Sequence, residues 1–290
     1  MTLKNGIKNT KKLDAYVITL INDARSTALA RECLRSINDI GCCLSPYILP
    51  ATTPITMEEH LFGMKEDDFG FEKGSFQAAL QVKNPRSSVL EMNHTVKVGY
   101  PLVEKDNRLD LATGLQLNAY RAKNPLKIVA CTISHMRAWA QACKTNRMIM
   151  VLEQDAHFIK KFKIGDLTQA DDNDKTWGVM GINIPEPGHT RRAGDYLNVM
   201  NQHLQENPKQ ILMPPPTINR IGEAPVPQGL AGNSAYLIKP WAARELLAKT
   251  LELGIWPNDA LMCKELFPWI RQIVYPFTRI QESTTSTTTG

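Results

Sequence analysis

The chain has 290 residues, of which 43% are hydrophobic and 22% charged, the composition of a folded globular protein. This excludes an intrinsically disordered chain, a collagen and a coiled-coil rod. The net charge of +5 is too small over this length to identify a nucleic-acid binder, and no uninterrupted apolar run is long enough for a membrane span. The six cysteines form no C-x-x-C pair, so we expect free thiols in a reducing compartment.

The N-terminal part of the chain opens with a strand, a helix and a second strand. The apolar run Ala15–Ile21 predicts a central strand that is covered on both faces. Residues 25–37 have a helical pattern that ends at Gly41, and a second strand is expected at 47–49. This order indicates an α/β fold. The lysine-rich segment 1–13 is expected to be a basic tail.

The second half of the chain contains further α/β elements. Residues 131–144 predict a helix, and the apolar run 148–152 predicts a strand. Further strands are expected at 177–182 and 229–238, and a helix is expected from Pro240 to the glycine at 254. Residues 54–127 predict only short helices and loops, and the proline-rich segment 185–228 predicts mainly loop, typical of a binding loop or lid.

An acidic pair directly follows the predicted strand at 148–152. Glu153 and Asp155 are separated by one residue, so along an extended chain their side chains point the same way and can meet one cation. Ligands of open α/β sheets gather beyond the carboxyl ends of strands, where this pair falls. Carboxylate oxygens suit Mg²⁺ or Mn²⁺, which such sites commonly share with substrate phosphates. The alternative is a hydrogen-bonded loop closure without a ligand.

Several motifs together resemble glycosyltransferase family 25, which contains bacterial lipooligosaccharide galactosyltransferases and the collagen galactosyltransferases. Residues 131–139 are similar to the family's GC-x-x-SH helix start with a tryptophan one turn on, and residues 150–156 are similar to its strand ending in LEDDA. Further similar islands are Asn22 and Arg25 after the opening strand, the strand at 232–240, and the P-x-D at 257–259. The chain departs from the family at Gln154, where the middle Asp is usual, and at Ala130, where a Gly is common.

The resemblance implies an α/β fold of the GT-A type, with a nucleotide-sugar-binding sheet, helices on both faces and loop-rich acceptor insertions. It implies an enzyme of lipopolysaccharide biosynthesis that transfers a hexose, galactose or glucose, from a UDP-sugar to a glycan or protein hydroxyl with inversion. Such a reaction needs a divalent cation at the departing diphosphate, here Mn²⁺ or Mg²⁺, and a carboxylate base at the acceptor hydroxyl. Residues 1–282 are then one domain, followed by a disordered tail at 283–290.

The resemblance also assigns roles to individual residues. Asp155 is expected to be the main metal ligand, and Glu153 a second ligand or a contact to the nucleotide. Asp259 is the candidate catalytic base, and the alternative for it is a loop cap after the preceding proline. Trp256, in the same turn, is a candidate for stacking on a sugar ring.

Four more residues are candidates for binding the UDP-sugar. Ser134 and His135 are expected to begin a helix whose N-terminal end favours the negative charge of a diphosphate. Asn22 and Arg25 follow the first strand and are candidates for the uridine or the phosphates. The alternative for His135 is a structural histidine that is held by hydrogen bonds.

Two other functions stay open from the sequence. The loss of a carboxylate at Gln154 favours a degenerate relative that binds a glycan without turnover. A nucleic-acid-binding module is the third, but no aromatic stacking motif accompanies the lysines. We expect a cytoplasmic protein that binds a nucleotide-sugar donor and a glycan acceptor and can contact membranes peripherally through its basic N-terminus.

Overall fold

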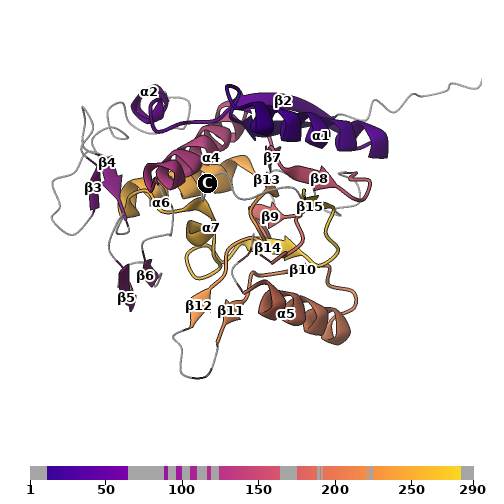
Figure 1. Ribbon diagram of the computed structural model, residues 1–290. Coiled ribbons are helices and arrows are strands. Elements are labelled where there is room, and N and C mark those ends of the chain that lie inside the picture. Colours follow the sequence, from indigo (N-terminus) through magenta and orange to yellow (C-terminus); the bar gives the residue numbers. More distant parts are fainter. Residues whose placement is uncertain are drawn as a thin grey trace, which may run out of the picture.

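A computed structural model of the chain describes residues 12–64, 88–90, 96–99, 105–109, 116–118, 124–163, 175–187, 190, 192–219, 221 and 225–281. The predicted tail at 283–290 and nearly all of the basic segment 1–13 lie outside the described residues. The fold is mixed α/β and is built on a seven-stranded sheet with the order β10-β14-β9-β13-β7-β1-β2 (Figure 1).

The opening of the chain forms the predicted strand–helix–strand unit. Strand β1 (Leu13–Thr19) is parallel to β2 (Leu44–Pro50), and helix α1 (Ala24–Ile40) connects them. The strand ends two residues before the apolar run does, because the amide of Leu20 donates to Ser26 Oγ at 2.9 Å and turns the chain toward α1. The helix ends at Gly41, as predicted, in a left-handed conformation with φ 68°.

The remaining strands complete the sheet on the other side of β1. Strand β7 (Ile149–Glu153) is parallel to β1, and β13 (Ala235–Ile238) is antiparallel to both β7 and β9 (Val179–Gly181). Strand β14 (Ile270–Ile273) is parallel to β9, and β10 (Leu212–Met213) is antiparallel to β14. The predicted strand at 148–152 is therefore confirmed, whereas β9 and β13 form within the predicted 177–182 and 229–238 but are shorter.

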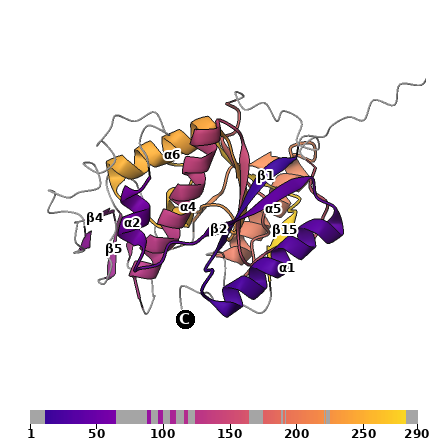
Figure 2. The ribbon, with the colours of Figure 1, turned by 90° about the horizontal axis from the view of Figure 1, so that it is seen from above.

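Helices cover both faces of the sheet, as the sequence predicts. Met150 and Leu152 of β7 share a core with Ile37 of α1, whereas Val151 points to the opposite face and shares a core with α4 (Leu126–Thr145) and α6 (Pro240–Leu253). Figure 2 shows α1 on one side of strands β1 and β2, and α4 and α6 on the other. None of the described helices is long and apolar enough to cross a membrane.

The structure corrects three sequence predictions. Helix α4 begins at Leu126, five residues before the predicted start, because Asn124 Oδ1 accepts a bond from the Leu126 amide and starts the helix there. The proline-rich 185–228 is not only loop but contains helix α5 (Ala193–Glu206), which buries Tyr196. Strand β14 was not predicted at all.

The other described elements are short. They are α2 (Met57–Phe62), α7 (Asn258–Leu261), and the paired strands β3 (Ser88–Leu90) with β4 (Val96–Val98), β5 (Lys105–Leu109) with β6 (Gln116–Asn118), β8 (Ala156–Phe158) with β15 (Thr278–Ile280), and β11 (Thr217–Ile218) with β12 (Val226–Pro227).

The end of α1 provides a test of the fold with a matched control. Gly41→Ala is expected to lower the free energy of unfolding by about 1 kcal/mol, because an L side chain is strained at φ 68°. A Cβ at Gly194 in α5 meets nothing within 4 Å, so Gly194→Ala is expected to stabilise the protein by up to about 1 kcal/mol. Urea denaturation checks both, and equal shifts of the same sign would contradict the assigned end of α1.

Candidate functional site

The candidate site lies at one edge of the sheet, where the carboxyl ends of several strands meet. Strands β1, β7 and β9 run in the same direction, and antiparallel β13 begins at the edge where they end. Ile18 of β1 pairs with Glu153 of β7, and the Glu153 amide donates to Ser234 O at 2.7 Å. Strand β1 lies between β2, to which the chain continues, and β7. The carboxyl end of β1 is therefore a point where the strand order reverses, and open α/β sheets bind ligands at such points.

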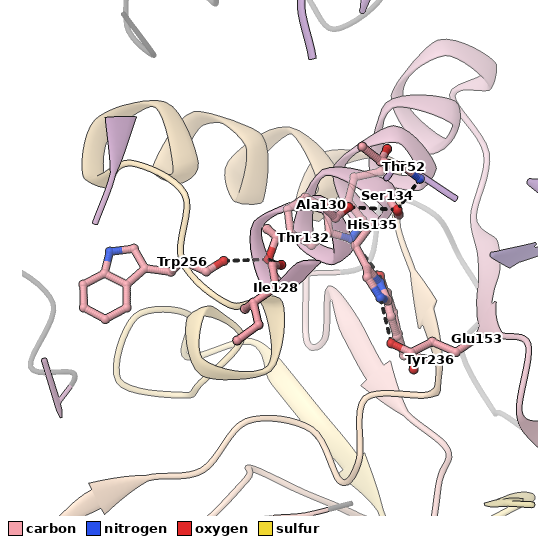
Figure 3. A network of polar contacts seen from close by, with 10 residues as sticks. Thr52, Ile128, Ala130, Thr132, Ser134, His135, Glu153, Tyr236 and Trp256 are labelled. Atoms are coloured by element: carbon pink, nitrogen blue, oxygen red, sulfur yellow. Dashed lines mark hydrogen bonds and ion pairs between the residues drawn. The ribbon is translucent and has the colours of Figure 1, made fainter. Parts of the chain in front are cut away.

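A chain of hydrogen bonds fixes the Glu153 carboxylate (Figure 3). The fully buried His135 on α4 places Nε2 3.0 Å from Glu153 Oε1 and Nδ1 2.8 Å from the Tyr236 hydroxyl. Trp139 Nε1, which can only donate, bonds to the same hydroxyl at 2.8 Å. Because a carboxylate oxygen accepts, His135 Nε2 donates to Glu153, and the Tyr236 hydroxyl accepts from Trp139 and also bonds to His135 Nδ1.

Asp155 follows Glu153 in the turn between β7 and β8. Burial and the nearby Glu153 carboxylate raise the pKa of Asp155 to about 7. Its Oδ1 atom is buried and has no hydrogen-bond partner among the described residues. A buried carboxylate oxygen without a partner is costly, so it indicates a ligand that supplies positive charge.

Cys131 belongs to the same group of side chains. It lies one turn before His135 on α4, and Cys131 Sγ, a His135 ring nitrogen and a Glu153 carboxylate oxygen all lie within 4.8 Å of one another. Burial, and then the carboxylates of Glu153, Asp259 and Asp155, raise the pKa of the Cys131 thiol well above its ordinary value. The charges of all three carboxylates therefore act on this one thiol.

Asp259 reaches this location because a hydrogen bond ties its segment to α4. Thr132 Oγ1 donates to the carbonyl of Trp256 at 2.9 Å, and the chain then enters α7, where Asp259 is exposed in the first turn. Trp256 itself is 1% exposed. The expectation that its ring stacks on a sugar is therefore wrong, since the ring is part of the core that α4 and α6 share.

The other predicted residues divide into two groups. Asn22 is exposed in the turn after β1 and Arg25 is exposed in the first turn of α1, at the same sheet edge as Glu153. Ser134 and His135, in contrast, lie in the third turn of α4 and not at its N-terminus, so the argument that placed them at a diphosphate is wrong. The Ser134 hydroxyl accepts from the Thr52 amide at 2.8 Å and donates to the helix backbone.

Sequence reasoning missed several polar side chains at this edge. Tyr236 of β13 is fully buried, and its hydroxyl bonds to His135. Asn233 and Ser234 are buried just before β13 and carry side-chain atoms that bond to none of the described residues. Cys131 was missed as well. Its spacing of four residues from His135 could have indicated that it belongs to the site, because residues four apart lie on one face of a helix.

Comparison with known proteins identifies the family. The family model described as glycosyltransferase family 25 (LPS biosynthesis protein) matches residues 78–262, which is more than half of the chain. The chain belongs to this family and is a glycosyltransferase, which confirms the resemblance found in the sequence. Among solved structures, mouse xyloside xylosyltransferase 1 in its apo form is similar, with 14% identity and a TM-score of 0.34 over 84% of this chain and 72% of that chain. No curated protein matches.

The hydrogen-bond chain predicts a specific loss of stability. Tyr236→Phe leaves Trp139 Nε1 and His135 Nδ1 without the hydroxyl that they share, so the free energy of unfolding is expected to fall by about 1–3 kcal/mol. Tyr47→Phe is the control, because Tyr47 is half exposed on the edge strand β2. A similar effect of both variants in urea denaturation would show that the shared hydroxyl contributes nothing to stability.

The raised pKa of Asp155 predicts a pH dependence of stability. The folded chain holds this proton up to about pH 7, whereas the unfolded chain loses it near 3.8. Asp155 therefore lowers the free energy of unfolding as the pH rises between those values. Asp155→Asn should remove this contribution, so the stability of the variant relative to wild type should rise over the same pH range. Urea denaturation in metal-free buffer across this range measures it. Gly194→Ala alters no titratable group, so it should change the free energy of unfolding by the same amount at every pH. The prediction is refuted if Asp155→Asn depends on pH as wild type does.

Proposed function

We propose that the protein transfers a hexose from a UDP-sugar to a glycan or protein hydroxyl, with inversion, on a GT-A-type fold. The observation that carries this proposal is the carboxylate pair Glu153 and Asp155 at the carboxyl edge of the sheet, in a chain of glycosyltransferase family 25. The proposal treats residues 1–282 as one domain, because β1 and β14, from the two ends of the chain, belong to one sheet.

The side chains at this edge fit a divalent cation. Asp155 Oδ1 is buried without a hydrogen-bond partner among the described residues, and burial and the nearby Glu153 carboxylate raise the pKa of Asp155. Asp155 and Glu153 would hold Mn²⁺ or Mg²⁺, since hard cations prefer carboxylate oxygens. When bound, the cation offsets the negative charge of the departing diphosphate.

The neighbouring residues would position the carboxylate, bind the donor and act as the catalytic base. His135 donates to Glu153 and fixes the orientation of its carboxylate, so His135 is a positioning residue. Asn22 and Arg25 stand at the same edge, where the guanidinium attracts the phosphates of the donor. Asp259, exposed in α7, would accept the proton of the acceptor hydroxyl as that oxygen attacks the anomeric carbon.

A second candidate function is recognition of a glycan without turnover. Gln154, which stands where the family usually has an Asp, is 8% exposed between the two carboxylates. It carries no charge, so the site offers one carboxylate fewer to a cation. Binding of glycans with no release of UDP from any donor and acceptor would favour this function over transfer.

Calorimetric titration of UDP tests the proposed donor site. At about pH 8, above the pKa of Asp155, UDP should bind with Mn²⁺ and should lose at least about tenfold in affinity with EDTA or in Asp155→Ala. Asp14→Ala is the control, because Asp14 lies at the amino end of β1, on the opposite edge of the sheet, where it pairs with Arg147. Binding of UDP that ignores both chelation and the Asp155 variant would refute the metal assignment.

Transfer is then tested directly. Asp259→Asn is expected to lower kcat by at least about a hundredfold while UDP affinity stays unchanged, because the base acts only on the acceptor hydroxyl. UDP release and product mass, measured over a panel of UDP-hexoses and glycan acceptors, provide the readout. An Asp259→Asn variant with full activity would remove Asp259 from the role of base.

A further inference from the structure

We propose that Cys131, His135 and Glu153 form a binding site for one Zn²⁺ ion, beside the carboxylate pair proposed for the donor. The three side chains come from two elements, helix α4 and the end of strand β7. Their ligand atoms all lie within 4.8 Å of one another, and the distance from His135 Nε2 to Glu153 Oε1 is 3.0 Å. A small adjustment would let one ion replace that hydrogen bond.

The donor set selects the metal. Thiolate and imidazole ligands favour Zn²⁺ over Mg²⁺ or Mn²⁺, which prefer oxygen ligands. Sites with three protein ligands and one open position are typical of zinc that remains accessible to solvent or substrate. Glu153 forms the open side of the site, since its side chain is 25% exposed, whereas His135 is fully buried.

The framework around the ligands is already in place (Figure 3). Thr132 and Ser134, which lie between Cys131 and His135, bond to the carbonyl of Trp256 and the amide of Thr52, so this turn of α4 is held from two sides. The second ring nitrogen of His135 bonds to the Tyr236 hydroxyl. Metal-ligating histidines usually make such a hydrogen bond with the nitrogen that does not bind the metal.

Zn²⁺ binding would change where the protons of the ligands lie. The Cys131 thiol would give its proton to solvent and bind as thiolate. The imidazole proton would move from Nε2 to Nδ1, from which it donates to Tyr236 Oη, while Nε2 binds the ion. The Tyr236 oxygen has two lone pairs and accepts from both His135 and Trp139. One proton is released for each ion bound.

A shared ligand links this site to the proposed reaction. Glu153 belongs both to the thiol-containing site and to the carboxylate pair, so Zn²⁺ should inhibit transfer, and Cys131→Ser should relieve the inhibition. This consequence rests on the proposed function, whereas the binding of Zn²⁺ does not.

Cobalt spectroscopy on the full chain tests the site without any turnover. Co²⁺ should bind one ion per chain with a thiolate-to-metal charge-transfer band in the near ultraviolet, and Zn²⁺ should displace it. Cys131→Ser should abolish the band and weaken Zn²⁺ binding by at least about tenfold in competition with a chromophoric chelator, since even the loss of an outer-shell partner costs that much. Cys43→Ser, at another half-buried cysteine, should leave both unchanged.

Two further measurements keep the outcomes distinct. Thermal unfolding verifies that Cys131→Ser folds, and Cys131→Ala replaces it if it does not. A Co²⁺ complex without the charge-transfer band, or a band that persists in both Cys131 variants, overturns the zinc site. Loss of the proposed donor site would instead appear as absent Mn²⁺-dependent UDP binding while the cobalt band remains.

Discussion

The contact between His135 and Glu153 is the interaction on which the rest of the site depends. It joins helix α4, which lies on one face of the sheet, to the end of strand β7 inside it. The Tyr236 hydroxyl bonds to the imidazole and accepts from Trp139, so three buried side chains from two elements set the position of one carboxylate. Chemistry at the edge of the sheet is thereby coupled to the packing of the core.

Electrostatics explains why this edge needs a ligand. Glu153, Asp155 and Asp259 all act on the thiol of Cys131, and the pKa of Asp155 is raised to about 7 by burial and by Glu153. Carboxylates that crowd in a partly buried location are unstable unless protons or cations compensate their charge. The diphosphate of the proposed UDP-sugar donor would add further negative charge, so the proposed function requires a cation at this edge.

Local sequence patterns predicted the elements that carry strong local signals. The ends of α1 at Gly41 and of α6 before the glycine at 254 were found because glycine terminates helices recognisably. Helix α5, in contrast, was hidden among prolines, and the pairing of β14 with β9 joins residues about ninety positions apart, which no local pattern encodes. The acidic pair was predicted from a single strand end, but the role of Tyr236 depends on a contact between α4 and β13 that only the tertiary structure brings together.

The most direct test of the central claim is a crystal structure with UDP and Mn²⁺, with anomalous diffraction measured at the manganese edge. The account predicts an anomalous peak within bonding distance of a carboxylate oxygen of Asp155 or Glu153, with the diphosphate of UDP on the same ion and its uridine toward Asn22 and Arg25. A peak remote from both carboxylates, or UDP bound away from the carboxyl edge of β1 and β7, would contradict it.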